Sequence, residues 1–299
     1  MSSSREHTHL DVNGITLHVV QQGPADGGLV ILLHGFPEYW YGWRKQMDAL
    51  AEQGYRVWAP DQRGYNRSDK PEAVSAYRVD RLAADIAGLI RVSGRDKAIV
   101  VGHDWGGIVA WNVGRRYPEL VDRLVILNAP HEAAMGRYTV KHPLQLFRSS
   151  YAGFFQLRGV PEQALGAGGY KPLWRMLKGS SRPGTFTEED LVHYEEAWSQ
   201  PEALRSMINW YRANVRTLFA PEPPYRVPVP VLVIWGARDP FLGRELALRS
   251  LAFCDAGRVV YFENATHWVH LEEAQRVNAL LIDFFMDSQF LAGQLASWE

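Results

Sequence analysis

Short apolar runs alternate with helical segments along most of this 299-residue chain, and this alternation limits the folds it can adopt. The run Leu29–Leu33 contains no polar residue, as is typical of a strand that is buried on both faces. Runs of the same kind predict further strands at residues 55–59, 98–102, 124–127, 229–235 and 258–262. Helices are predicted between them at residues 42–53, 80–93, 105–117, 243–252 and 271–288. Strands that alternate with helices indicate an α/β fold, with a mostly parallel sheet between two helical layers. Residues 9–22 add a hairpin that turns at Asn13-Gly14.

The alternation stops after Leu127 and resumes at Val229. The residues between them have the pattern of helices and Gly/Pro loops, without a convincing strand. We therefore expect one core, made of residues 1–130 and 226–299, that is interrupted by a helical cap or lid at residues 131–225. The prolines of residues 221–224 mark the return to the core.

One helix of this insertion places a tyrosine on its packed face. Residues 199–202, Ser-Gln-Pro-Glu, have the pattern of a capping box and predict a helix start. In the helix that follows, Leu204, Met207, Ile208 and Tyr211 recur at the spacing of one helical face. Tyr211 is therefore predicted to point inward, and this pattern alone fits either a core residue or a functional one.

Composition excludes several partners. The 32 basic and 33 acidic residues leave no basic field for a nucleic acid. No apolar run approaches the ~20 residues of a membrane-spanning helix, so no membrane partner is expected. Cys254 is the single cysteine and no signal peptide is visible, which favours a cytoplasmic location. The sequence does not reveal the oligomeric state.

The segment Gly-His-Asp-Trp-Gly-Gly at residues 102–107 carries the clearest chemical signal. It follows an apolar strand and opens a helix, and glycines stand two residues before and after Asp104. This spacing is typical of a nucleophile elbow, in which a tight strand–turn–helix exposes one side chain. An ordinary glycine-rich turn is the alternative. The glycine patterns of nucleotide-binding loops are absent.

An aspartate at the elbow indicates a different reaction from that of a serine. Its carboxylate is ionised at neutral pH and needs no base before it attacks. Attack on a saturated carbon with a strained or good leaving group would give an ester of Asp104. Hydrolysis of that ester would then need a base and an oxyanion hole.

Residues that could supply these functions follow the expected strands. Asp239 and His267 complete the order nucleophile, acid, histidine, with His267 as the base for water and Asp239 as its orienting partner. His270 is a rival base three residues further on. The backbone N–H groups of Phe36 and Trp105 are candidates for the oxyanion hole. No ligand-spaced set of His, Cys and Glu is seen, so neither a metal nor a cofactor is expected.

At this point the chain resembles the α/β-hydrolase-fold epoxide hydrolases and is similar to the hydrolytic domain of soluble epoxide hydrolase. The resemblance rests on His-Gly-Phe-Pro-Glu-Tyr-Trp at residues 34–40, on the elbow, and on Asn-Trp-Tyr-Arg at residues 209–212. It implies conversion of a small hydrophobic epoxide and water to a vicinal diol, without a cofactor. It also implies a cis bond before Pro37.

The resemblance gives Tyr211 the role of a hydrogen-bond donor to the epoxide oxygen. The family usually has a second cap tyrosine, but here Phe154 aligns with that position, and Tyr151 could replace it if the segment is helical. Two other functions remain open. A haloalkane dehalogenase would use the same nucleophile and base with N–H donors for the halide, and a non-enzymatic scaffold would only bind.

Tryptophans gather near the proposed site in the sequence. Trp40, Trp43, Trp105, Trp210, Trp235 and Trp268, six of the 11, lie within seven residues of a proposed catalytic or oxyanion element. We therefore expect an apolar, aromatic-walled substrate pocket. The residues predicted to line it are His34, Pro37, Trp40, Phe154, Trp210 and Trp268.

Overall fold

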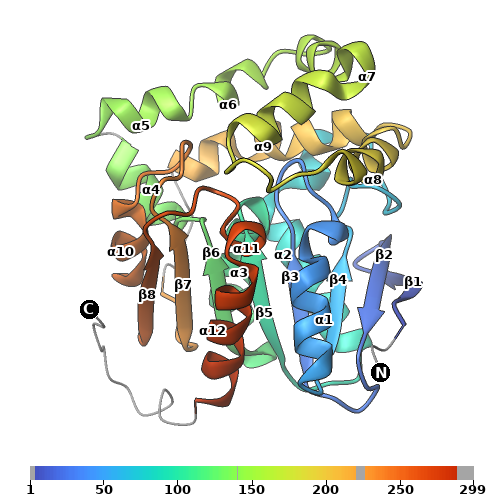
Figure 1. Ribbon diagram of the computed structural model, residues 1–299, viewed down its shortest axis with the longest axis vertical. Helices are drawn as coiled ribbons and strands as arrows, with labels where there is room; N and C mark the ends of the chain where they lie inside the picture. The colour runs from blue at the N-terminus through green and yellow to red at the C-terminus, as the bar shows by residue number, and fades with distance from the viewer. Residues whose placement is uncertain (1–3, 140, 220–225, 288–299) are drawn as a thin grey trace.

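The computed structural model describes residues 4–139, 141–219 and 226–287. One eight-stranded sheet runs through these residues in the order β1-β2-β4-β3-β5-β6-β7-β8 (Figure 1). The predicted α/β class is confirmed, and the strands are β1 (Glu6–Val12), β2 (Ile15–Gln22), β3 (Leu29–Leu33), β4 (Arg56–Pro60), β5 (Ala98–His103), β6 (Val121–Leu127), β7 (Val231–Gly236) and β8 (Gly257–Phe262). From β4 to β8 every neighbouring pair is parallel, whereas β2 is antiparallel to both β1 and β4.

The predicted hairpin joins β1 to β2 at one edge of the sheet. Asn13 and Gly14 both have positive φ angles, of 49° and 77°, and Val12 pairs with Ile15. A two-residue turn with two positive φ angles matches the twist of antiparallel strands. Asparagine and glycine are the residues that adopt these angles at low cost.

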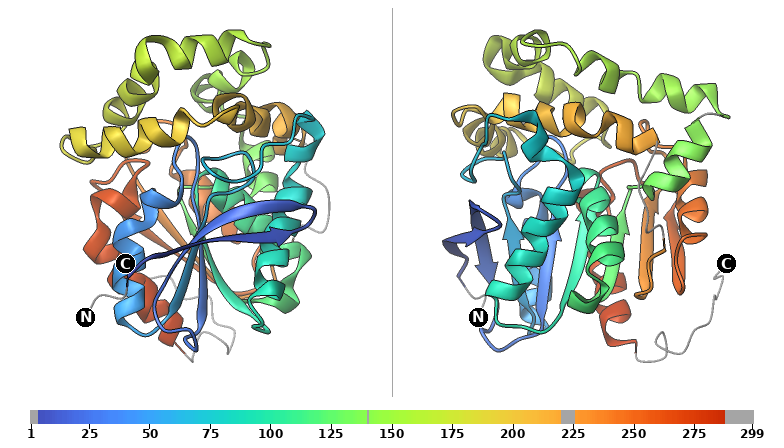
Figure 2. Two further views of the ribbon diagram at one scale, coloured as in Figure 1. Left: turned by 90° about the vertical axis from the view of Figure 1, so that its right-hand side faces the viewer. Right: turned by 180° about the vertical axis from the view of Figure 1, so that it is seen from behind.

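Helices cover both faces of the sheet, which is why its strands are apolar without alternation. In β3, Val30 and Leu32 pack against α1 (Arg44–Glu52) and α12 (Ala274–Met286), whereas Leu29, Ile31 and Leu33 belong to the opposite core. That opposite face is covered by α2 (Val79–Val92), α3 (Trp105–Arg116) and α10 (Glu245–Leu251) (Figure 2). The shorter elements of this core are η1 (Trp40–Trp43), η2 (Val74–Tyr77), η3 (Pro118–Leu120) and α11 (Val269–Glu272). The segment predicted as one helix at residues 271–288 is thus divided at Glu273, whose φ of −122° is not helical.

The chain between β6 and β7 is helical in the part that the structure describes, as predicted. Its elements are α4 (Glu132–Thr139), α5 (Pro143–Arg148), α6 (Tyr151–Phe154), α7 (Val160–Gly179), α8 (Glu188–Trp198) and α9 (Ala203–Phe219). These helices lie above the carboxyl edge of the sheet, with α9 beneath α6 and α7 (Figures 1 and 2). The proline-rich residues 221–224 lie outside the described residues. Within the described ranges, no helix has both the length and the apolar character needed to cross a membrane.

The predicted capping box at residues 199–202 is wrong. Ser199 is the C-cap of α8, its hydroxyl donates to the carbonyl of Glu196, and Glu202 has a φ of 62°. The residues Ser-Gln-Pro-Glu therefore form the sharp turn between α8 and α9 and do not cap the start of a helix. A true capping box lies at Thr187, whose hydroxyl accepts from the N–H of Asp190 while the Asp190 carboxylate accepts from the N–H of Thr187.

Glycines allow the turn between β5 and α3 to approach the neighbouring loop. A Cβ atom at Gly106 would lie 2.1 Å from the carbonyl oxygen of Leu33, and one at Gly102 would lie 2.3 Å from that of Gly106. Between them, Asp104 has φ 51° and ψ −123°, which is a strained conformation for a residue other than glycine. The turn thus presents one side chain above the sheet at the cost of local strain.

We expect Gly106→Ala to lower the free energy of unfolding by about 3 kcal/mol or more, because the new methyl group would collide with backbone that cannot move cheaply. Gly153→Ala is the matched control, since a Cβ atom there meets nothing within 4 Å. Urea denaturation of both variants measures the difference. Equal stabilities would contradict the close approach at Gly106.

Candidate active site

Asp104 lies at the start of α3, directly after β5, with its carboxylate held from two sides. Its Oδ1 atom accepts a hydrogen bond of 2.8 Å from the backbone N–H of Phe36. Its Oδ2 atom lies 3.4 Å from Nε2 of His267. The loop after β3 and the loop after β8 therefore meet at the elbow, as the sequence predicted. The other candidate donor, Trp105, is the first residue of α3, where backbone N–H groups have no partner within the helix.

His267 is oriented by Asp239, which follows β7. Nδ1 of His267 lies 2.7 Å from Oδ2 of Asp239. The same carboxylate accepts hydrogen bonds from the side chain of Asn128 and from the backbone N–H groups of Phe241 and Leu242. These donors fix Asp239 in place, and the other ring nitrogen of His267, Nε2, lies toward Asp104. The structure thus brings together the three residues that the sequence separates by up to 163 positions.

The two carboxylates raise the basicity of the ring between them. Burial by itself lowers the pKa of His267, but the charge of Asp239 and the hydrogen bonds to both aspartates outweigh it and raise that pKa to about 10. For Asp104, burial acts to raise the pKa, but the hydrogen bond and charge of His267 lower it overall. Both shifts favour an ionised Asp104 beside a protonated His267.

Two tyrosines approach Asp104 from the helices above. Tyr211 comes from α9 and Tyr151 from the first residue of α6, and their ring centroids are 5.8 Å apart. Their hydroxyl groups interact, and burial raises the pKa of both well above that of a free tyrosine. Both hydroxyls therefore stay protonated and can donate. The segment that carries Tyr151 is helical, which was the condition for its replacing the second cap tyrosine.

A narrow cavity connects these tyrosines to Asp104. Its described lining is apolar apart from a few groups, and consists of Asp104, Trp105, Ile108, Asn128, Ala129, Pro130, Met135, Ser149, Tyr151, Ala152, Tyr211, Val215 and Leu242. Asp104 lies on one side and the paired hydroxyls approach it from the cap helices. Such a cavity suits a small apolar molecule with one polar atom.

The six residues that were predicted to line the substrate pocket are absent from the described lining of this cavity. Phe154 is 38% exposed on the far side of α6, and the neighbouring Phe155 packs on the ring of Tyr211 instead. His34 is buried, where its Nε2 atom accepts from the N–H of Gln62. The cis peptide before Pro37 is confirmed, but Pro37 also lies outside the described lining.

The tryptophans that were predicted to line the cavity instead contact other segments of the fold. The indole N–H of Trp210 donates to the carbonyl of Arg63, and that of Trp268 donates to the hydroxyl of Ser180. Trp40 lies against His7, in a different hollow of the surface. Among the described tryptophans, Trp105 is the one that lines the cavity. Tryptophans that are close to the site residues in sequence therefore pack around the site. The prediction overestimated how many of them line the cavity.

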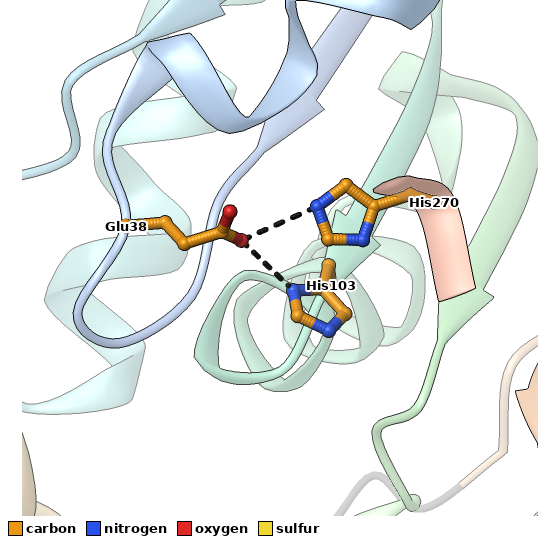
Figure 3. A group of neighbouring side chains, drawn as sticks. All are labelled: Glu38, His103 and His270. Carbon is orange, nitrogen blue, oxygen red and sulfur yellow. Dashed lines mark ion pairs between the residues drawn. The ribbon is translucent and has the colours of Figure 1, made fainter. Parts of the chain in front are cut away.

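A buried group behind His267 was missed by the sequence analysis. Oε2 of Glu38 lies 3.3 Å from Nδ1 of His103 and 3.3 Å from Nε2 of His270, and all three side chains are inaccessible to solvent (Figure 3). His270, the rival base, therefore faces Glu38 instead of Asp104. The three residues come from separate segments, so no spacing could reveal the group, although its donor atoms lie close enough together to hold a metal ion.

This group joins the three loops that form the site. Nε2 of His103 donates to the carbonyl of His267, and the hydroxyl of Tyr194 donates to Oε1 of Glu38. Burial acts to raise the pKa of Glu38, but the charges and hydrogen bonds of His270 and His103 outweigh it and hold that pKa well below its usual range.

Comparison with known proteins agrees with this geometry. The family description of the alpha/beta hydrolase fold matches residues 28–274. An AB hydrolase superfamily protein, YfhM, of Bacillus subtilis is 46% identical over 275 residues, which cover 92% of this chain and 96% of the relative.

Solved structures of epoxide hydrolases superpose over nearly the whole chain. Epoxide hydrolase A of Mycobacterium thermoresistibile has a TM-score of 0.84 at 33% identity, and the match covers 94% of this chain and 98% of that one. A mutant of an epoxide hydrolase of Bacillus megaterium, complexed with a naphthyloxy propanediol product, has a TM-score of 0.84 at 29% identity. That match covers 94% of this chain and 100% of the other.

The shifted pKa of His267 predicts how stability depends on pH. The folded pKa of about 10 exceeds the value near 6.5 of an unfolded histidine. The protonated pair therefore stabilises the fold fully below about pH 6.5, and this contribution is lost as the pH rises toward 10. We expect the free energy of unfolding, measured with urea, to fall over this range in the wild type and to fall less in His267→Gln. Parallel declines in both proteins would assign the pH dependence to other groups.

Proposed function

This chain belongs to the α/β-hydrolase fold family and is closely related to the epoxide hydrolases, and from that premise we propose that it hydrolyses a hydrophobic epoxide to a vicinal diol. The observation that carries the proposal is the pair of tyrosine hydroxyls, Tyr151 and Tyr211, in the same cavity as Asp104. An epoxide oxygen leaves as an alkoxide and needs a proton, which neutral buried hydroxyls can supply. Residues 131–225 act in this proposal as the cap that carries both tyrosines.

In the first step, one carboxylate oxygen of Asp104 attacks a ring carbon of the epoxide. The bond between that carbon and the ring oxygen breaks, and the oxygen takes a proton from the tyrosine pair. The ester that forms at Asp104 has no charge, so the attraction that held the proton on His267 weakens. His267 then loses its proton, which restores the tyrosine, and becomes a neutral base.

In the second step, His267 removes a proton from a water molecule that attacks the carbonyl carbon of the Asp104 ester. Asp239 stabilises the imidazolium that results. The N–H groups of Phe36 and Trp105 are proposed to hold the oxyanion, and the Phe36 N–H already points at Oδ1 of Asp104. Cleavage of the ester releases the diol, the departing oxygen takes a proton from His267, and the new carboxylic acid returns its proton to His267.

A haloalkane dehalogenase is the second candidate, and the indole groups argue against it. A halide leaves unprotonated and needs N–H donors that face the cavity. The N–H of Trp198 donates to the carbonyl of Pro37 at 2.7 Å, and that of Trp210 is also committed to a carbonyl. Trp105, the one indole in the described lining, interacts with the hydroxyl of Tyr211. The intact Asp104, Asp239 and His267 geometry also argues against a scaffold that only binds.

Three substrates separate these candidates. We expect incubation with styrene oxide, 1-bromobutane and a p-nitrophenyl ester to yield diol, with little bromide or nitrophenol. With styrene oxide, His267→Gln should accumulate a covalent adduct on Asp104, visible as a mass increase of one substrate, because ester hydrolysis loses its base. Asp104→Asn is the control and should form neither adduct nor diol. Bromide release without diol would favour the dehalogenase, and turnover without an adduct would argue against the ester.

The tyrosine pair can be tested one hydroxyl at a time. We expect Tyr211→Phe and Tyr151→Phe each to slow formation of the Asp104 ester by about 10²-fold, since each removes one proton donor, and the double variant to abolish it. Tyr138→Phe is the matched control, because that hydroxyl contacts Glu245 outside the described lining. Single-turnover measurements with mass detection follow the ester. A wild-type rate in Tyr151→Phe would leave Tyr211 as the sole donor.

A further inference from the structure

Exposed apolar side chains concentrate on one segment of the helices above the sheet. Of the 11 large apolar side chains that are exposed among the described residues, six lie within residues 144–160, and Phe147 is the most exposed at 75%. They are Leu144, Leu146, Phe147, Phe154, Leu157 and Val160. The other five lie in five different helical elements. A cluster of this kind marks an interaction surface more often than single exposed residues do.

The same segment carries a net positive charge. Residues 133–161 contain Arg137, Lys141, Arg148 and Arg158 and no acidic residue. The remaining chain, with 28 basic and 33 acidic residues, is net acidic. Arg148 directly follows Phe147, and Arg158 directly follows Leu157, so positive charges border the apolar side chains. We name residues 141–160, which include Lys141, Arg148 and Arg158, the basic apolar strip.

The strip lies at the outer surface, above the cavity. Helices α5 and α6, which form much of it, are in the layer farthest from the sheet (Figures 1 and 2). Ser149, Tyr151 and Ala152 of the same segment line the cavity over Asp104. One short stretch of chain therefore has apolar and basic side chains on its exposed surface and the proposed proton donor on its inner one.

We propose that the basic apolar strip docks on the surface of anionic lipid bilayers. Apolar side chains that enter the headgroup region, flanked by basic residues that meet lipid phosphates, are the features of a segment that lies in the membrane interface. This mode needs no membrane-spanning helix. A second copy of the chain fits the strip less well, because a two-fold contact would bring like positive charges together.

Docking would place the segment that carries Tyr151 at the boundary where apolar molecules are most concentrated. The binding itself does not depend on the proposed hydrolysis, so the two proposals can fail separately. It depends only on the exposed apolar and basic side chains.

Sedimentation with lipid vesicles tests the proposal. The full chain is mixed with vesicles of phosphatidylcholine alone, or with about one third phosphatidylglycerol, at low and high salt. We expect binding to the anionic vesicles that high salt weakens, and about tenfold less binding to the neutral ones. No binding to either vesicle at low salt, or equal binding to both, would overturn the proposal.

Exposed positions allow variants that leave the core intact. Phe147→Ser with Leu157→Ser should abolish binding, and Arg148→Glu should weaken it by about fivefold or more. The matched control is Val92→Ser with Leu248→Ser, whose side chains are 52% and 65% exposed elsewhere on the molecule, and it should bind as the wild type does. Equal loss in the control would overturn the assignment to the strip. So would a concentration-dependent dimer, measured by analytical ultracentrifugation, that Phe147→Ser dissociates.

Discussion

The interaction on which the site depends is the placement of one buried imidazole ring between two carboxylates. His267 lies 2.7 Å from Asp239 and 3.4 Å from Asp104, and these residues follow three different strands, β8, β7 and β5. Strands β6 and β7 must therefore keep their register between β5 and β8, because a shift of one residue would move a side chain to the other face. Continuous apolar strands, packed on both faces, provide this rigidity.

In the proposed mechanism, this arrangement lets one histidine serve both steps. While Asp104 is ionised, its charge helps to keep the buried His267 protonated. Esterification of Asp104 would remove that charge and leave Asp239 as the only carboxylate beside the ring. The chemistry of the first step would therefore prepare the base for the second, without movement of the backbone.

The sequence predicted the strands and the meeting of Asp104, Asp239 and His267, because these depend on apolar runs and on which residues directly follow them. It did not predict the cavity wall, because side-chain direction decides that wall. Trp210 and Tyr211 are neighbours on α9, yet one indole donates to Arg63 of the core and the other side chain enters the cavity. Phe154 and Tyr151 differ by three residues on α6, and only the latter faces Asp104. The Glu38 group was missed because its members come from a loop, the end of β5 and α11, and share no local pattern.

The neighbours of Tyr211 on α9 hold the two tyrosines close together, although these tyrosines belong to separate helices. Trp210 fastens α9 to the core below, and Arg212 fastens it to the segment of α6 above, since its guanidinium donates to the carbonyl groups of Phe155 and Leu157. Glu162 holds that guanidinium through a 2.6 Å ion pair. Consecutive residues of one helix thus bind the core, enter the cavity and position the segment of Tyr151. The contacts of α9 therefore hold both tyrosines, and a motion of α6 that breaks the Arg212 contacts would separate the two hydroxyls.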